Sequence, residues 1–171
     1  MSAYMGACRV VLPYTDKMDP SVVWALQAAG ADFESVDVGD SDTSYFNLLS
    51  GLWGAGRSFA ICEHDILAPP DAFVGFDSCP QEWCVYRYRY LHGVYWGLGL
   101  VRFRGSLLQR FPDLMDEVGE YDAPNHGPAH WCTLDMAVTA SLRARRVEWP
   151  HLHGEVTHLG DGQPSHGCRS K

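Results

Sequence analysis

The residues best suited to chemistry form a triplet, Glu63, His64 and Asp65, directly after the apolar run 58–62. Two carboxylates this close to the end of a buried strand need a compensating partner, because burying an unpaired charge is costly. A divalent cation is such a partner, and carboxylate oxygens suit Mg²⁺ or Mn²⁺. The alternative interpretation is a solvated loop whose two acids have no common role.

Histidines gather near the C-terminal end, in the segment H-L-H-G-E-V-T-H that contains His151, His153 and His158. The first two would share a face if the segment is extended, since side chains alternate along a strand. Imidazole is a common ligand for Zn²⁺, Mn²⁺ or Fe, so these residues are a second candidate metal site, with His166 or Cys168 as further ligands. The spacing matches no standard zinc module, and surface histidines in a turn are the alternative.

A third candidate is Asp135, which lies in a predicted helix between the apolar positions Leu134 and Val138. This placement indicates a carboxylate at the border of the core, where it could act as a general base. An exposed helical acid is the alternative, because a surface helix needs a polar face.

Two glycines, Gly97 and Gly99, interrupt a predicted strand and would allow close approach to its backbone. They do not form the dinucleotide-binding fingerprint, and no lysine follows them as in a P-loop.

Strands and helices that alternate along the first 65 residues must position the triplet. The apolar patterns and turn residues predict strands at 9–13, 33–38 and 58–62, with helices between them over 20–29 and from Ser41 or Asp42 to Gly54. This alternation favours a parallel sheet with right-handed crossovers. Ligands bind beyond the carboxyl ends of such strands, which draws attention to the loops 14–16, 39–42 and 63–65.

The second half of the sequence is less regular. We expect a short helix after Pro70, strands at 83–88, 97–103 and 147–149, helices at 105–111 and 131–142, and a loop at 119–129. The residues 161–171 read as a loose tail after a single domain of residues 1–160.

Composition narrows the class of protein. The chain has 171 residues, of which 46% are hydrophobic and 20% charged, as expected for one globular domain. A net charge of −8 argues against nucleic acid as a partner. No apolar run reaches the roughly 20 residues that span a bilayer. Six cysteines without a C-x-x-C pair, and no signal peptide, predict reduced thiols and a cytoplasmic location.

The order of these motifs resembles the GT-A fold of glycosyltransferases, as a small family-2-like member. The resemblance covers about residues 8–160: a first strand ending in P-Y-T, a β-α-β-α-β half, I-C-E-H-D-I as a variant of the D-x-D motif, Y-W-G-L-G-L-V-R-F, W-C-T-L-D, and H-x-H with a final histidine. It implies a single-domain, Rossmann-like α/β fold with a mixed, mostly parallel sheet flanked by helices. Two departures are the short chain and the glutamate in the first position of the triplet.

The resemblance also implies roles for individual residues. Asp65 would bind a divalent metal, Mn²⁺ or Mg²⁺, with Glu63 at the donor ribose or in the metal shell and His153 or His158 as a further ligand. Asp135 would be the catalytic or acceptor-binding acid. Tyr14, Thr15 and Asp40 would flank the base of a nucleotide-diphosphate sugar, and Gly97 and Gly99 would lie near the transferred sugar.

The acceptor, the donor and the stereochemistry, inverting or retaining, are not determined by the sequence. A partner or a second copy of the chain could complete the acceptor side of so short a domain. Two other functions stay open: a domain that binds a metal or a nucleotide sugar without catalysis, and a nucleotidyltransferase.

Overall fold

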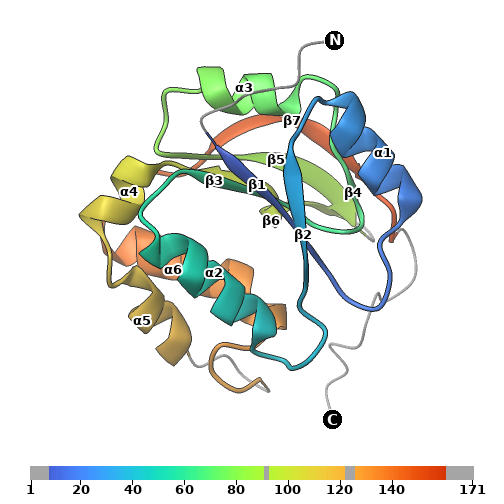
Figure 1. The fold of residues 1–171 in the computed structure, drawn as a ribbon. Coiled ribbons are helices and arrows are strands. Elements are labelled where there is room, and N and C mark those ends of the chain that lie inside the picture. The colour runs from blue at the N-terminus through green and yellow to red at the C-terminus, as the bar shows by residue number, and fades with distance from the viewer. Residues whose placement is uncertain (1–7, 91–92, 122–125, 161–171) are drawn as a thin grey trace.

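The computed structural model describes residues 8–90, 93–121 and 126–160, which form a seven-stranded sheet with helices on both faces (Figure 1). The strands are β1 (Arg9–Tyr14), β2 (Phe33–Asp37), β3 (Phe59–Cys62), β4 (Ile66–Leu67), β5 (Trp83–Tyr90), β6 (Gly93–Phe103) and β7 (His151–His158). The helices are α1 (Pro20–Ala28), α2 (Ser44–Gly54), α3 (Ala72–Ser78), α4 (Gly105–Arg110), α5 (Leu114–Glu120), a 3₁₀ turn η1 (Trp131–Thr133) and α6 (Leu134–Ala144).

The strands lie in the order β2-β1-β3-β6-β5-β7-β4. β1 pairs in parallel with β2 and β3, and β5 pairs in parallel with β7. The pairings β3·β6, β5·β6 and β4·β7 are antiparallel. The expected fold class, a single Rossmann-like α/β domain with a mixed sheet flanked by helices, is confirmed.

Local signals account for the first half of the fold. The side chain of Asp19 caps α1 by accepting a hydrogen bond from the backbone N–H of Ser21 at 2.8 Å, and Pro20 occupies the first turn. Gly30 ends the helix with a φ of 71°, which favours glycine. The expected cap of α2 by Ser41 or Asp42 is wrong: Thr43 is the cap residue, and its side chain makes no capping hydrogen bond.

The core has one part on each face of the sheet, because side chains alternate along the strands. In β3, Phe59 and Ile61 pack toward α2, α4, α5 and α6, whereas Ala60 and Cys62 pack toward α1 and α3. All four are at most 1% exposed. A strand buried on both faces fixes the point at which the chain must leave the sheet, directly before Glu63.

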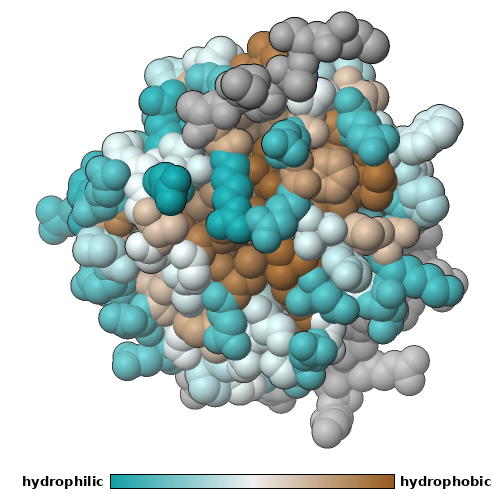
Figure 2. Space-filling model, in the orientation of Figure 1, coloured by the Kyte–Doolittle hydropathy of each residue, from teal (hydrophilic) through white to brown (hydrophobic). Residues whose placement is uncertain are grey.

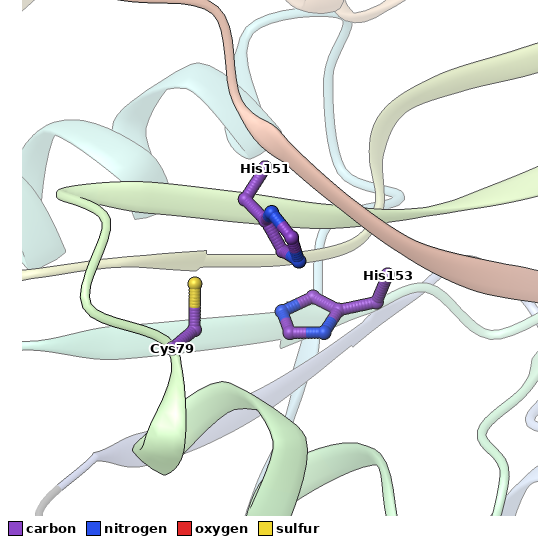
Figure 3. A group of neighbouring side chains, drawn as sticks. All are labelled: Cys79, His151 and His153. Carbon is purple, nitrogen blue, oxygen red and sulfur yellow. The ribbon is translucent and has the colours of Figure 1, made fainter.

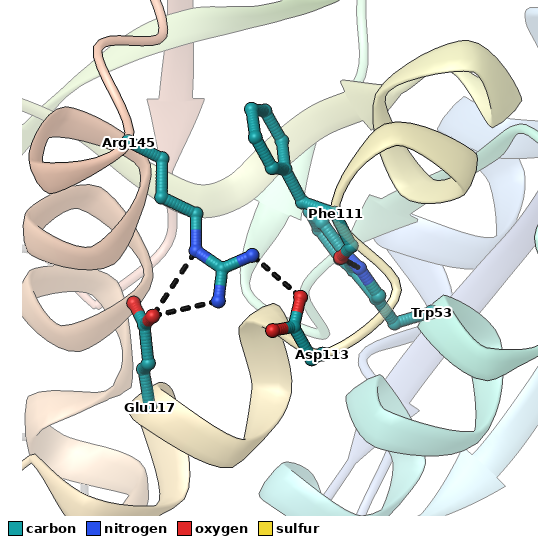
Figure 4. Close-up of polar contacts among 5 residues, drawn as sticks. All are labelled: Trp53, Phe111, Asp113, Glu117 and Arg145. Atoms are coloured by element: carbon teal, nitrogen blue, oxygen red, sulfur yellow. Dashed lines mark hydrogen bonds and ion pairs between the residues drawn. The ribbon is translucent and has the colours of Figure 1, made fainter.

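Polar contacts join the helices below the sheet (Figure 4). Arg145, at the end of α6, donates to Asp113 at 2.6 Å and to Glu117 of α5 at 2.6 and 3.2 Å. Its side chain is 16% exposed, whereas the carboxylates of Asp113 and Glu117 are 64% and 47% exposed, so this network lies at the surface. Trp53 of α2 donates to the carbonyl of Phe111 at 2.8 Å. These contacts join α6 to α5, and α2 to the segment between α4 and α5.

The second half departs from the sequence-based expectations in three places. Residues 147–149 form no strand, and the strand is instead β7, which includes all three histidines of its segment. The helix α5 and the short strand β4 were not predicted.

The expectation that every thiol is reduced is also wrong, because Cys132 is disulfide-bonded, whereas Cys8, Cys62, Cys79 and Cys84 are free.

The face seen in Figure 2 carries hydrophobic residues at its centre, between α1 and α2, with polar residues around them. No helix within the described part of the chain has the length and apolarity that crossing a membrane requires. The expected tail 161–171, with His166 and Cys168, lies outside the described residues.

Candidate active site

The triplet lies at the carboxyl end of β3 because a tight turn follows the buried strand. The N–H of Glu63 still belongs to the sheet, donating to the carbonyl of Gly99 at 2.8 Å. The N–H of Ile66 then closes a turn onto the carbonyl of Glu63 at 3.1 Å and begins β4. Glu63 and Asp65 are thereby held beside the sheet edge, both partly buried.

Glu63 points toward the α2–α6 face of the sheet. The hydroxyl of Tyr45, on α2, donates to Oε1 of Glu63 at 2.9 Å. Burial raises the pKa of the Glu63 carboxyl well above its usual range, and the neighbouring carboxylates of Asp135 and Asp65 raise it further. Glu63 therefore lies close enough to both Asp135 and Asp65 for their charges to repel it, an arrangement that a cation would relieve.

Asp135 approaches the same point from the first turn of α6. Its Oδ1 accepts a hydrogen bond from the backbone N–H of Leu98 at 3.0 Å. Burial raises the pKa of Asp135 to about 6, although the hydrogen bond from Leu98 acts in the opposite direction. Gly97 makes this approach possible, because a Cβ atom there would lie 2.3 Å from Oδ2 of Asp135.

Asp65 is paired with His158, at the far end of β7. The Nε2 atom of His158 lies 3.2 Å from Oδ2 of Asp65, and the two side chains are 9% and 19% exposed. Burial acts to raise the pKa of Asp65, but the hydrogen bond and charge of His158, together with the charge of His64, outweigh it, and the pKa is lowered. The other oxygen, Oδ1, is buried without a hydrogen-bond partner.

His158 has both ring nitrogens in defined contacts. Its Nδ1 accepts from the N–H of Gly160 at 3.1 Å, which leaves Nε2 to donate toward Asp65. In this geometry His158 orients the carboxylate, as outer-shell partners of metal ligands commonly do. The ring also stacks on Tyr88, with centroids 5.5 Å apart.

Gly99 gives Tyr88 the space for this stacking, because a Cβ atom at position 99 would lie 2.9 Å from Cε1 of Tyr88. The pairing of β5 with β6 is irregular between Val85 and Arg87, so the strands are locally out of their regular register here. Both glycines of the G-L-G segment thus make room for protein side chains.

The loops after β1 and β2 lie at the same edge of the sheet. The N–H of Val38 donates to the carbonyl of Tyr14 at 2.9 Å, and a Cβ atom at Gly39 would lie 3.7 Å from Cα of Thr15. Asp40 is exposed beyond them. The residues expected at the nucleotide base therefore lie at the ends of two neighbouring strands, β1 and β2, of which β1 pairs with β3, and their role stays a prediction.

His153 does not join this group and lies instead beside His151 and Cys79 (Figure 3). It lies five residues before His158 on β7, a separation of about 16 Å along a strand at roughly 3.3 Å per residue. Its ring stacks on Tyr86 at 5.1 Å and meets Phe76 edge-on at 5.6 Å. The structure thus places His153 away from Asp65, because an extended strand separates its two ends.

Two tyrosines of the site, Tyr45 and Tyr88, were not among the predicted site residues. Tyr45 lies on α2 and is 8% exposed. The available signal was its hydroxyl, since a buried tyrosine O–H usually finds a partner. Tyr88 gave no such signal, because its place depends on the pairing of β5 with β7.

The fold of this protein is similar to the folds of known structures. The structure is similar to the crystal structure of a glycosyltransferase involved in the glycosylation of the major capsid of PBCV-1, with a TM-score of 0.51 and 10% identity over 86% of this chain and 82% of that chain. It is also similar to the inositol-1-phosphate CTP transferase from T. maritima, with a TM-score of 0.44 and 11% identity over 90% of this chain and 71% of that one. No family model matches the sequence, and no curated protein does.

Proposed function

We propose that this protein is a metal-dependent glycosyltransferase that moves a sugar from a nucleotide-diphosphate sugar to an acceptor. The observation that carries the proposal is the buried, unpartnered Oδ1 of Asp65 next to Glu63, whose carboxyl group also feels the charge of Asp135, at the carboxyl edge of the parallel strands. The fold shared with a glycosyltransferase supports the same conclusion.

The donor set fits Mg²⁺ or Mn²⁺. These cations take oxygen ligands, and Mg²⁺ in particular is usually held by one or two carboxylates together with substrate phosphates. Asp65 would bind through Oδ1 and Glu63 through its carboxylate, while His158 keeps the Asp65 side chain in place. The metal would stabilise the negative charge that develops on the nucleoside diphosphate as it leaves.

Asp135 is suited to accept a proton. With a pKa raised to about 6, it is mostly ionised at neutral pH yet more basic than an ordinary aspartate. In an inverting reaction it would take the proton of the acceptor hydroxyl as that oxygen bonds to the anomeric carbon and the nucleoside diphosphate departs. The Leu98 N–H holds the carboxylate in one orientation during this step.

The nucleotide base would bind at the ends of β1 and β2. Tyr14 ends β1 and Thr15 follows it, and β1 lies between β2 and β3, so a ligand over these residues would reach toward Glu63. Asp40, exposed on the neighbouring loop, would contact the base. Gly97 and Gly99 would lie near the sugar, beside Asp135.

The thermal unfolding temperature tests the donor site. We expect a nucleoside diphosphate to raise the unfolding temperature only when Mn²⁺ is present, because the cation would hold the phosphates. A ligand at 100 times its Kd stabilises the native state by about 2.7 kcal/mol. Asp65→Asn should abolish the metal-dependent part of the shift. Asp116→Asn, an exposed acid on α5, is the matched control and should behave as the wild type. An equal shift without metal, or in Asp65→Asn, would contradict the metal site.

Product analysis tests the reaction itself. Incubation with nucleotide sugars should release nucleoside diphosphate, and Asp135→Asn should lower kcat by roughly 100-fold or more, the range of a lost general base. Donor affinity in that variant should change little. Release of inorganic diphosphate from a nucleoside triphosphate would instead indicate a nucleotidyltransferase.

A further inference from the structure

A second cluster of potential metal ligands lies at the opposite end of β7 from His158. Cys79 follows α3, and His151 and His153 begin β7; their side chains point toward one another (Figure 3). One ligand atom from each residue, the sulfur of Cys79 and a ring nitrogen of each histidine, lies within 4.8 Å of the others.

Strand geometry explains the meeting of these residues. His151 and His153 are two positions apart on an extended strand, so they share a face, and their ring centroids are 4.7 Å apart. Cys84 of β5 is the partner of His151 in the parallel pairing. The short connection from α3 to β5 therefore brings Cys79 over the beginning of β7.

The state of the side chains suits a metal. Cys79 carries a free thiol and is 4% exposed. The Nε2 atom of His153 is buried without a hydrogen-bond partner. Burial lowers the pKa of His153, which favours the neutral imidazole that binds metals. Packing against Tyr86 and Phe76 holds the ring in one orientation.

Arg102 sets the charge balance around the cluster. Its guanidinium donates to the carbonyl of Cys79 at 3.1 Å and to Sγ of Cys84 at 3.2 Å. A positive charge here disfavours a cation held by neutral ligands alone. A metal at this place therefore needs the negative charge of a Cys79 thiolate.

We propose that Cys79, His151 and His153 bind a Zn²⁺ ion. One thiolate and two imidazoles form a ligand set that suits zinc and does not suit Mg²⁺. His151 is exposed, so a water molecule can complete the tetrahedral coordination from the solvent side. The thiol proton is released to solvent as the sulfur binds. The ion would fasten the end of α3 to the beginning of β7.

Another group of similar spacing, His126, His130 and Cys132, carries no such inference. The sulfur of Cys132 is in a disulfide and offers no thiolate. The Nδ1 atom of His130 already accepts a hydrogen bond from the N–H of Cys132 at 3.1 Å.

Cobalt substitution of the full chain, after removal of any histidine tag, tests the site. Co²⁺ bound by a thiolate gives a charge-transfer band in the near ultraviolet, which oxygen and nitrogen ligands do not give. We expect the band in the wild type with one equivalent of Co²⁺, and its displacement by Zn²⁺. Cys79→Ser should lose the band. Cys62→Ser, a buried free thiol of the same core, and Asp65→Asn should both retain it.

His151→Ala keeps the test decisive should Cys79→Ser fail to fold. His151 is exposed, so its loss should leave the fold intact. We expect zinc affinity, measured against a competing chelator, to fall by roughly tenfold or more, since even the loss of an outer-shell partner costs about 10–100-fold. No band in the wild type, a band that survives in Cys79→Ser, or unchanged affinity in His151→Ala would each overturn the proposal.

Discussion

The two ends of β7 present histidines to very different neighbours. At the end of the strand, His158 faces Asp65 among three carboxylates. At its beginning, His151 and His153 face the thiol of Cys79, and the guanidinium of Arg102 donates to the carbonyl of Cys79. The same residue type therefore supports an oxygen-rich site at one end and a sulfur–nitrogen site at the other. Because ligand type selects the metal, we expect the two ends to sort Mn²⁺ or Mg²⁺ from Zn²⁺.

Asp65→Asn should give the largest difference between the two ends. An amide cannot supply the negative charge that holds a divalent cation, so we expect the rate of sugar transfer to fall by about 10³-fold or more. Zinc content and the cobalt charge-transfer band should not change. Steady-state kinetics and metal analysis on the same sample check both statements. A normal rate of sugar transfer in Asp65→Asn would contradict the proposed metal site at the carboxylate end of β7.

Asp135→Asn should raise the unfolding free energy near pH 7, although the same substitution should lower kcat. The pKa of Asp135 is raised from 3.8 to about 6, so between these pH values the native state holds a proton that the unfolded chain has lost. The unfolding free energy therefore falls as pH rises through this window, by up to about 3 kcal/mol, since one pH unit corresponds to about 1.4 kcal/mol. The asparagine oxygen can still accept from Leu98.

Urea denaturation in metal-free buffer measures this effect. Near pH 7 the Asp135→Asn variant should be more stable than the wild type, and below pH 3.8 the two should agree. Cys79→Ser removes no carboxyl group, so this variant should show no such pH-dependent gain. A variant less stable than the wild type at pH 7 would contradict the burial of an ionised Asp135.

Gly97→Ala should disturb the carboxylate end alone. The new Cβ would lie 2.3 Å from Oδ2 of Asp135, so the side chain must move, at a cost of about 1–3 kcal/mol in stability. The matched control is Gly154→Ala on β7, where the nearest atom would be Cε1 of Tyr86 at 3.7 Å, an ordinary contact. We expect turnover to fall in the first variant and not in the second. Equal effects would show that Gly97 has no special role.

Tyr45→Phe is the smallest of these changes. It removes the hydroxyl that donates to Glu63 and should lower the unfolding free energy by about 1 kcal/mol. If Glu63 helps to hold the metal, the concentration of Mn²⁺ needed for half-maximal nucleotide binding should rise in this variant. Zinc affinity at Cys79 should stay the same, and a change there would mean that the two ends are coupled.

The candidate site was partly accessible from sequence. Glu63, Asp65 and Asp135 were identified from their positions after a buried strand and on an apolar helix face, and the structure brings them together. His153 was grouped with His158 because a spacing of five residues does not reveal how far an extended chain separates them. Tyr88 could not be found, since its contact with His158 depends on strands that pair across more than 60 residues.

The sequence by itself determined the β-α-β-α-β half. The Asp19 cap, the proline that follows it, the turn at Gly30 and the fully apolar β3 are local signals, and they fix where Glu63 leaves the sheet. Only the tertiary structure decided what meets these acids. The parallel pairing of β5 with β7, and the antiparallel pairing of β4 with β7, set His158 against Asp65 and the other two histidines against Cys79. Such pairings depend on burial and on hydrogen bonds between distant segments, which no local pattern of residues encodes.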